Sequence, residues 1–413
     1  MKIAVIHPGK QHSFQLATAL HKRGLLWKYI TSVYDRSFSL TSILLKFSKG
    51  DLKKKISSRK CAFIPNDKVL QYNELFVIIT LFLNRLPFFH KFAERWNYLV
   101  ESSFYKKTMG YLRHSQPDAV VYYNGYANKH LELLKDKKVI KFMDVSIGHR
   151  LYLQKILDNE IEATGLVQIK SEHFSYWDEK MIASDLKGCA ETDFFLVPSE
   201  FVKKSLVENG IPLNKIIKVP YGVNVQQFAP KSDNVIGPNE KLKLLYVGSI
   251  SYRKGIHRLL NVVRKYPNIE MYLAGGYSQD SKIYLQYKDC ANIHFLGFVT
   301  RDRLNQVYND CHVFVLPSFC EGMAMVGLEA MSAGLPIICT TNTGVNDVVI
   351  NGENGFVYSP EDESSLESHI LWFDKNRSKL LEMSKNARKT SLSYSWEKYH
   401  ENVANAIIDC VKK

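Results

Sequence analysis

The chain has 413 residues, 46% of them hydrophobic and 23% charged, a composition typical of folded globular proteins and not of disordered ones. One hydrophobic core rarely organises a chain of this length, so two domains of about 200 residues each are expected. The formal net charge is +14, and residues 1–150 carry all of the excess, with 26 Lys and Arg against 10 Asp and Glu.

The seven cysteines occur singly, without a Cys-x-x-Cys pair, and an odd number fits no closed set of disulfides. They are expected to be free thiols in a reducing compartment. The opening apolar run, residues 3–6, ends at Pro8-Gly9 and is too short for a signal peptide. These observations predict a cytoplasmic protein.

The first half alternates strand and helix patterns. Residues 3–6 read as a buried strand, and Phe14, Leu16, Ala17 and Leu20 then recur at helical spacing. Further strands are predicted at residues 119–123, 139–143 and 194–197, with helices between them. This alternation indicates a parallel sheet covered by helices.

A basic segment followed by an apolar one distinguishes residues 46–89. Residues 46–60 contain one acidic residue, Asp51, and seven basic residues: Lys46, Lys49, Lys53, Lys54, Lys55, Arg59 and Lys60. The apolar residues that follow are 76–83, Leu86, Phe88 and Phe89, and a run of eight is too short to span a bilayer. Two interpretations remain open: attachment to an anionic membrane surface, or a solvated charged segment before a core helix.

Nucleic acid is the other partner that such charge would attract. The sequence contains no zinc-ligand pattern, no aromatic RNA-binding motif and no basic heptad helix. We therefore predict that the protein does not bind nucleic acid.

A second domain is predicted after a polar linker at residues 230–240, preceded by a transition at Val219-Pro-Tyr-Gly-Val-Asn224. Strand patterns then resume at residues 242–247, 269–274, 293–296, 313–316 and 337–339. We predict a first domain at 1–222, a second at 223–393, and a final segment at 394–413 that contains a helix.

A pair of cations follows the first strand of the second half. Gly248-Ser249 predicts a tight turn, and Arg253-Lys254-Gly255 opens a helix. A guanidinium binds phosphate oxygens in a fork, and an ammonium adds a mobile point charge, so this pair suits a diphosphate. Most Arg-Lys pairs are solvated, but the position after a strand and a glycine turn favours binding. The segment lacks the glycines of a dinucleotide fingerprint, which disfavours an NAD-dependent enzyme.

Two glutamates lie eight positions apart around a predicted helix start. A strand ends at Pro317, Glu321 lies in the following turn, and Glu329 lies on a helix that stops near Gly334. A helical rise of about 1.5 Å per residue would separate the carboxylates by roughly 12 Å. The free amides of residues 323–325 are expected to hold an anionic diphosphate. For either glutamate alone, helix capping or a surface ion pair is an equally good interpretation.

Taken together, this segment resembles the Glu-x7-Glu signature of family 4 retaining glycosyltransferases with the GT-B fold. The resemblance also rests on Val247-Gly-Ser-Ile250, Leu296-Gly-Phe298, Asn351-Gly-Glu-Asn-Gly-Phe356 and Tyr394-Ser-Trp396. It implies an α/β protein of the GT-B class, with two Rossmann-like domains whose parallel sheets face each other across a cleft. The final helix would cross back to the first domain.

The resemblance also implies roles for individual residues. Arg253 and Lys254 would hold the donor diphosphate, Glu321 the sugar hydroxyls and Glu329 the ribose hydroxyls. His149 would lie near the transferred sugar, so the expected catalytic residues are His149, Glu321, Arg253 and Lys254. Substrate-binding positions would be Gly9, Asp144, Gly248, Phe298, Val299, Gly322, Met323, Ala324, Met325 and Glu329. His7 and His12 are further candidates for acceptor contacts.

The implied reaction is transfer of a sugar, with retention, from a nucleotide-diphosphate sugar to an acceptor hydroxyl. The acceptor would be a saccharide or a lipid-linked saccharide of surface polysaccharide synthesis, with the enzyme peripheral on the inner face of the membrane. No cofactor and no metal are expected, because no Asp-x-Asp pair is suitably placed. Two alternatives stay open: a GT-B sugar-nucleotide epimerase, and a non-catalytic nucleotide-sugar-binding scaffold at the membrane.

Overall fold

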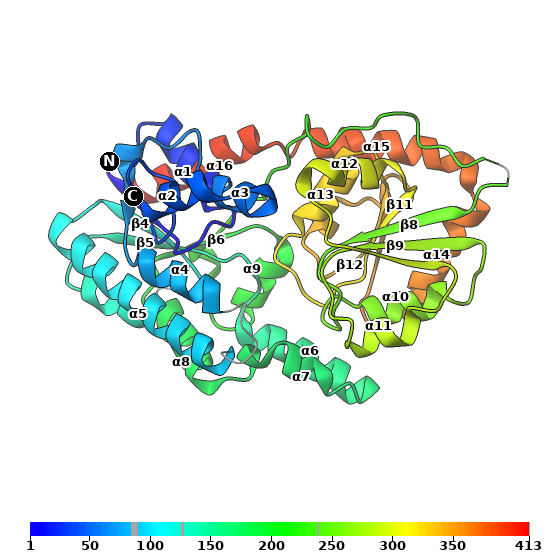
Figure 1. Cartoon of the computed structure of the whole chain (residues 1–413), viewed down its shortest axis with the longest axis horizontal. Helices are drawn as coiled ribbons and strands as arrows, with labels where there is room; N and C mark the ends of the chain where they lie inside the picture. Colours follow the sequence, from blue (N-terminus) through cyan, green and yellow to red (C-terminus); the bar gives the residue numbers. More distant parts are fainter. Residues whose placement is uncertain (84–89, 125–127, 238, 413) are drawn as a thin grey trace.

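The computed structural model describes residues 1–83, 90–124, 128–237 and 239–412. They form two sheets flanked by helices, one in each half of the chain (Figure 1). The strand orders are β3-β2-β1-β4-β5-β6-β7 and β10-β9-β8-β11-β12-β13, and the recorded strand pairs within these sheets are parallel. The predicted α/β architecture is confirmed.

The strands of the first sheet are β1 (Ile3–Ile6), β2 (Leu26–Thr31), β3 (Val69–Gln71), β4 (Ala119–Tyr123), β5 (Ile140–Asp144), β6 (Phe194–Val197) and β7 (Ile216–Lys218). Those of the second are β8 (Leu242–Val247), β9 (Ile269–Ala274), β10 (Ile293–Gly297), β11 (Val313–Leu316), β12 (Ile337–Thr340) and β13 (Gly355–Tyr358).

The helices of the first half are α1 (Ser13–Lys22), α2 (Leu40–Phe47), α3 (Gly50–Ser57), α4 (Glu74–Leu83), α5 (His90–Ser115), α6 (Arg150–Thr164), α7 (Gln168–Glu172), α8 (Glu179–Ala190) and α9 (Glu200–Val207). The later helices are α10 (Ile256–Val263), α11 (Lys282–Tyr287), α12 (Arg301–Asn309), α13 (Met325–Ser332), α14 (Glu363–Lys375), α15 (Leu380–Leu392) and α16 (Trp396–Lys412).

All nine strands expected from the sequence are present, six with the predicted bounds and three shifted or extended by one residue. The sequence analysis missed β2, β3, β7 and β13. The last three have three or four residues each and lie at sheet edges, where a short run of partly exposed side chains carries little apolar signal. In β2, Lys28 interrupts the apolar run.

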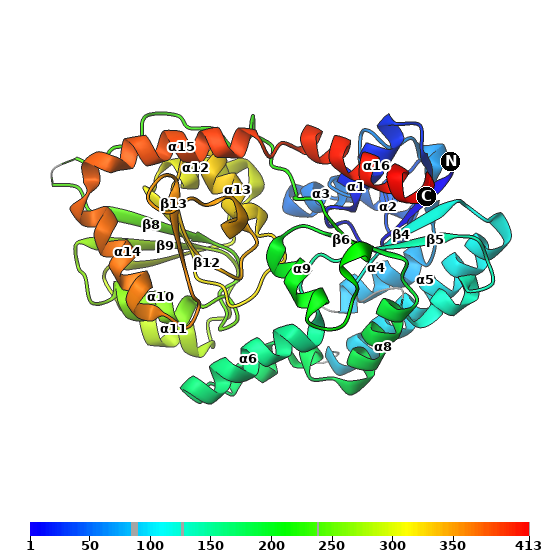
Figure 2. The same ribbon diagram turned by 180° about the vertical axis from the view of Figure 1, so that it is seen from behind.

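The chain passes between the two halves twice, and the two crossings meet. Val223 forms a parallel bridge with Ser395, and its amide donates to the carbonyl oxygen of Tyr394 at 2.8 Å. Beyond this point α15 leads into α16, which lies along the first half beside α1 (Figure 2). The His400 ring contacts Gln15 at 2.8 Å and Lys22 at 3.2 Å. The last helix therefore packs on the first half.

Gly255 is tightly packed, so a larger residue at this position is expected to destabilise the fold. This residue has φ of +69°, and a Cβ added to it would lie 1.9 Å from the carbonyl oxygen of Pro317. Gly24 has the same φ with nothing within 4 Å, which makes it a matched control. We expect Gly255→Ala to lower the free energy of unfolding by about 2 kcal/mol more than Gly24→Ala, because it adds an overpacking cost to the shared backbone strain. Urea unfolding of both variants tests this, and equal losses would contradict it.

Candidate active site

Three charged side chains meet where the strand order of the second sheet reverses. Arg253 and Lys254 lie in the turn between β8 and α10, and Glu321 lies in the turn between β11 and α13. β8 and β11 are neighbours, and ligands of open α/β sheets bind at the carboxyl ends of such strands. The Lys254 ammonium contacts Glu321 Oε1, and Arg253 Nη1 lies 3.7 Å from Glu321 Oε2. The structure thus brings the three predicted residues together.

Burial shapes the charges of this cluster. Desolvation alone would raise the pKa of the Glu321 carboxyl, but the charges of Lys254 and Arg253 outweigh it and hold that pKa below its ordinary value. Burial lowers the pKa of Lys254, and Glu321 offsets only part of this effect. Arg253 also donates from Nη1 to the carbonyl oxygen of Cys320 at 2.6 Å. Within this cluster, two cations therefore lie beside the Glu321 carboxylate.

The start of helix α13 differs from the prediction. The helix begins at Met325, and the Ala324 amide donates to the carbonyl oxygen of Thr343 at 3.0 Å. Of the three predicted amides, only that of Met325 lies in the first turn of the helix, next to that of Val326. The buried Met323 lies before the helix, and its sulfur accepts a hydrogen bond from the Tyr221 amide at 3.3 Å. Only four of the eight steps from Glu321 to Glu329 are helical, so the helical rise assumed for the predicted separation of roughly 12 Å applies to half of that stretch.

Gly322 lies against the first half of the chain. A Cβ on this residue would lie 1.8 Å from the carbonyl oxygen of Ser146, in the loop after β5. Its own carbonyl oxygen accepts a hydrogen bond from Ser199 Oγ at 2.6 Å. Glycine at this position therefore allows the two halves to meet beside Glu321.

Glu329 is buried on α13 and has two partners. Arg301 Nη2 lies 3.1 Å from Oε1, and the Tyr308 hydroxyl donates to Oε2 at 3.4 Å. Burial raises the pKa of Glu329, although the Arg301 charge opposes this effect. The sequence analysis did not select Arg301, yet its place just after β10, at the ligand-binding edge of the sheet, was a usable signal.

Gly248, Phe298 and Val299 lie at strand ends on this same edge. The Gly248 amide donates to the carbonyl oxygen of Ala274 at 2.9 Å, which joins the turn after β8 to the end of β9. Phe298 and Val299 follow β10, and 74% of Phe298 is exposed. An exposed aromatic ring at a strand end offers a stacking surface to a planar ligand.

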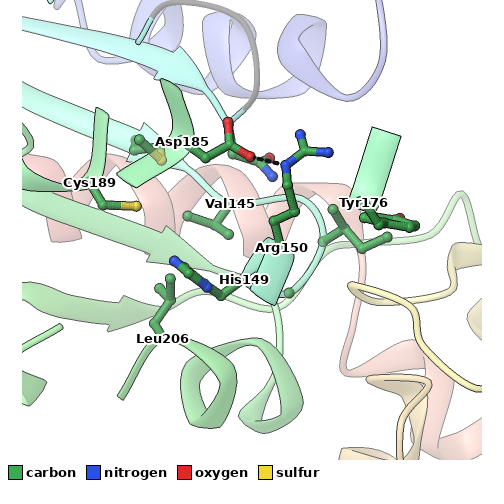
Figure 3. Close-up of a pocket in the computed structure, with 11 residues that line it drawn as sticks. Val145, His149, Arg150, Tyr176, Asp185, Cys189 and Leu206 are labelled. Carbon is green, nitrogen blue, oxygen red and sulfur yellow. Dashed lines mark hydrogen bonds and ion pairs between the residues drawn. The ribbon is translucent and has the colours of Figure 1, made fainter. Parts of the chain in front are cut away.

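His149 and Asp144, predicted as neighbours in function, lie in different surroundings. Asp144 is buried at the end of β5, where His12 Nε2 contacts Oδ2 at 2.9 Å and the Tyr221 hydroxyl donates to Oδ1 at 3.3 Å. His149 precedes α6 and lines a separate cavity of about 40 Å³. Figure 3 shows its ring beside Leu206. His12, a predicted acceptor contact, therefore lies beside Asp144 and is bound to it.

The His149 cavity is polar on one side. The ring is buried, neither nitrogen has a hydrogen-bond partner among the described residues, and burial lowers its pKa. The Arg150 side chain points toward Asp185 and forms an ion pair with it (Figure 3). A space of this size holds about three water molecules, so a sugar would not fit into it as it stands.

Residues 172–175 of the first half, which the sequence analysis did not select, lie beside Arg253 and Lys254. Glu172 Oε2 accepts the Tyr252 amide at 3.0 Å, next to Arg253. Burial, with the added charges of Arg253 and Lys254, lowers the pKa of His173 to about 4, so its ring is neutral at pH 7. Arg150 Nη1 donates to the carbonyl oxygen of Ser175 at 2.6 Å and so anchors this segment. No sequence spacing marks these residues, because their place depends on packing between the halves.

Gly9 lies in the loop between β1 and α1, at the carboxyl edge of the first sheet. Its amide donates to His7 Nδ1 at 2.8 Å, and its carbonyl oxygen accepts from Thr31 Oγ1 at 3.3 Å. Burial lowers the pKa of His7 to about 4. The loop is therefore held by His7 and by Thr31 of β2. Across the described ranges, no group of three or more His, Cys, Asp and Glu could hold a metal ion.

Sequence comparisons match the second half of the chain. Residues 229–390 match the family model for glycosyl transferases group 1. An uncharacterized glycosyltransferase of Methanocaldococcus jannaschii is 26% identical over 229 residues, covering 54% of this chain and 63% of that protein. The O-antigen biosynthesis glycosyltransferase WbnH of Escherichia coli is 29% identical over 218 residues, covering 52% and 58%. The chain thus matches about half to two thirds of these relatives' length.

Structural comparisons cover the whole chain. A sucrose-phosphate synthase of Thermosynechococcus elongatus superposes with a TM-score of 0.69 at 17% identity, over 99% of both chains. Anabaena HepE in complex with UDP-glucose superposes with a TM-score of 0.63 at 15% identity, over 99% of this chain and 100% of that chain. The protein therefore has the fold of GT-B glycosyltransferases, and its second half carries the sequence pattern of group 1 glycosyl transferases.

Proposed function

We propose that the protein is a retaining glycosyltransferase of family 4 that moves a sugar from a nucleotide-diphosphate sugar to an acceptor hydroxyl. The observation that carries the proposal is the cluster of Arg253, Lys254 and Glu321 at the reversal point of the second sheet. The group 1 match, residues 229–390, includes Arg253, Lys254, Glu321 and Glu329. The first-half residues near this cluster lie outside the match. Because HepE was solved with UDP and with UDP-glucose, a UDP-sugar is the first donor to test.

In this proposal, the leaving diphosphate displaces the Lys254 ammonium from Glu321. Arg253, Lys254 and the amides of Met325 and Val326 then take up the negative charge that develops as the glycosidic bond breaks. Glu321 would be released to accept hydroxyl hydrogen bonds from the sugar. The leaving phosphate would help to deprotonate the acceptor on the same face, so no enzyme nucleophile is needed. Since side chains supply the positive charge, no bound metal is required.

Glu329 and Phe298 would bind the nucleoside. Contacts from Arg301 and Tyr308 orient the buried Glu329 carboxylate, which supports a role in accepting hydrogen bonds from the ribose hydroxyls. Phe298 would stack on the base. His149 and Asp144 are assigned to the acceptor side, where His149 could contact the sugar once the small cavity beside it opens.

A ligand screen followed by product analysis tests the function. Thermal-shift measurements with UDP-, GDP-, ADP- and dTDP-sugars should show stabilisation by one nucleotide class, because a ligand bound to the folded state raises its apparent stability. The donor so found is then incubated with and without saccharide acceptors. Transfer with retention supports the proposal. Conversion of the donor alone into an epimer, or binding without turnover, would overturn it in favour of an epimerase or a scaffold.

We further propose that the acceptor is a membrane-associated saccharide of surface polysaccharide synthesis, as the names of relatives in O-antigen and capsule synthesis suggest. No described helix is long and apolar enough to cross a bilayer. On α2, the exposed Ile43, Leu44 and Phe47 lie close in sequence to Lys46 and Lys49. Such a surface suits an anionic membrane. Leu86, Phe88 and Phe89, which the sequence analysis added to this surface, lie outside the described residues.

A charge-reversal variant tests the membrane surface. Changing Lys46, Lys49 and Lys53 to glutamate should abolish sedimentation with vesicles of anionic lipid, because each basic residue near such a surface contributes about 1 kcal/mol. The matched control changes Lys375, Lys385 and Lys389, which are exposed on the second half, to glutamate. Equal sedimentation of the two triple variants would contradict the membrane proposal.

A further inference from the structure

Two cations lie beside the Gly9 loop, and among the described residues neither has a recorded ion pair with an acidic side chain. Lys10 follows Gly9, and Arg59 lies just beyond α3. Arg59 Nη1 is 3.9 Å from the position that a Cβ on Gly9 would take. Burial lowers the pKa of both groups, and for Lys10 the neighbouring charges of Arg59 and Arg301 lower it further. The two cations therefore lie close together in a partly desolvated place.

The contrast with other partly buried cations is informative. Arg150, Arg253, Lys254 and Arg258 each lie within ion-pair distance of a carboxylate. For Lys10 and Arg59, no ion pair is recorded with any carboxylate in the described part of the chain, and the Lys10 ammonium lies 5.8 Å from the centroid of the Phe14 ring. Keeping like charges together away from water is costly unless an anion joins them.

The start of α1 adds to this positive field. Its first turn contains no acidic residue, and its N-cap, His12, makes no capping bond because the ring is bound to Asp144. The positive end of the helix dipole thus points toward the loop that carries Lys10.

The start of α12 in the second half lies near these cations, since the charge of Arg301 acts on Lys10. Lys54 on α3 lies 3.5 Å from Asp302 on α12, so the end of the first half that carries Arg59 meets the start of α12. Figure 1 shows α3 extending toward α12 and α13. Arg301, which pairs with Glu329, lies on the same turn as Asp302. Lys10 and Arg59 therefore face the side of the second half that we assign to the donor.

We propose that Lys10 and Arg59 form a second anion subsite, distinct from the Arg253–Lys254 pair, which binds a phosphate group carried by the acceptor. This inference rests on the proposed function. The donor diphosphate already has two cations and helical amides in the second half, so a cation pair on the first half serves a second phosphorylated ligand. The acceptor is thus a saccharide phosphate or diphosphate, the chemistry of a lipid-linked sugar.

The test compares two acceptors that differ only in phosphorylation. With the same saccharide offered as its diphosphate and as the free sugar, the unmodified protein should prefer the diphosphate. The Lys10→Met, Arg59→Met double variant should raise KM for the diphosphate acceptor about 100-fold, since each charged hydrogen bond lost costs about tenfold. KM for the free sugar and for the donor should change by less than about threefold on the same reasoning. Lys106→Met, Arg113→Met, at two exposed positions, is the control.

Three outcomes would overturn the subsite. A matching rise in the donor KM would assign Lys10 and Arg59 to the donor diphosphate, an equal loss with both acceptors would make them structural, and an unchanged KM would leave them without a role. A binding measurement separates this inference from the proposed function. Calorimetry with inorganic diphosphate, at saturating nucleoside diphosphate, should show binding to the unmodified protein and to Lys254→Met but not to the double variant. If no sugar is transferred at all, the proposed function fails, and this binding measurement still decides the subsite.

Discussion

Replacing Lys254 by methionine is expected to reduce turnover by about 10²–10³-fold, the usual effect of removing one preorganised group that stabilises charge in a transition state. Methionine keeps the unbranched apolar part of the side chain but lacks the ammonium that contacts Glu321 and would face the leaving diphosphate. The loss should appear in kcat, because the developing charge is greater in the transition state than in the bound donor. Initial rates at saturating donor measure it.

The control for this prediction is Lys265→Met. Lys265 lies two residues beyond α10 and forms an exposed ion pair with Glu367 at 3.0 Å, so the same chemical change there should leave kcat unaltered. Far-UV circular dichroism and the unfolding midpoint must show that Lys254→Met folds. A folded Lys254→Met variant with a rate within threefold of the unmodified protein would remove Lys254 from the proposed chemistry.

Replacing Glu160 by alanine is expected to lower the free energy of unfolding by about 3–5 kcal/mol, because it leaves a buried positive charge without its partner. Glu160 lies on α6 of the first half with a side chain 1% exposed. Its carboxylate accepts two hydrogen bonds from Arg258, at 3.0 and 2.6 Å, and lies 2.9 Å from His257 Nε2. Both partners are on α10, so the three residues join the two halves of the molecule (Figure 1).

The cost of Glu160→Ala is measured by urea unfolding. Glu162→Ala, on the same helix but exposed, is the control and should change stability by less than about 0.5 kcal/mol. A double-mutant cycle with Arg258→Ala should give a coupling energy above about 1.5 kcal/mol. Additive losses in that cycle would show that the pair does not join the halves energetically.

This contact also predicts a pH dependence. Burial would raise the pKa of Glu160, but hydrogen bonds from His257 and Arg258 and their charges outweigh it and lower that pKa below the ordinary value. A carboxyl with a lowered folded-state pKa contributes stability above its unfolded pKa, and this contribution disappears as the pH falls through the folded value. The stability gap between the unmodified protein and Glu160→Ala should be constant above about pH 5 and shrink below about pH 4.5. A gap that widened in acid would contradict the assignment.

The contact between α6 and α10 has a consequence for the active site. His257 stacks on Phe319 with ring centroids 6.1 Å apart, and the Phe319 amide donates to the carbonyl oxygen of Arg253 at 3.0 Å. Glu321 lies two residues further along. Glu160 is therefore expected to act as a positioning residue, so its removal should raise the donor KM as well as lower stability.

The sequence by itself determined the order of the nine predicted strands and the place of Arg253, Lys254 and Glu321 in the second half. The strand at residues 313–316 is a continuous apolar run, and the strand at residues 242–247 is apolar except for Lys243. A proline or a glycine follows each strand, and chemistry-bearing residues that come after such strands lie at one edge of a parallel sheet. For this reason Arg253, Lys254 and Glu321 could be placed together before the structure was known.

Only the tertiary structure decided which groups face each other across the two halves. Glu160 and Arg258 are 98 positions apart, and Ser146 meets Gly322 with no pattern in either segment to indicate it. The surroundings of His149 and Asp144 diverged for the same reason, because a side chain five residues along a loop can point into a different cavity. Periodicity and spacing report forces that act within one element, whereas the surroundings of Lys10, Arg59 and Glu160 depend on how the two halves of the chain pack together.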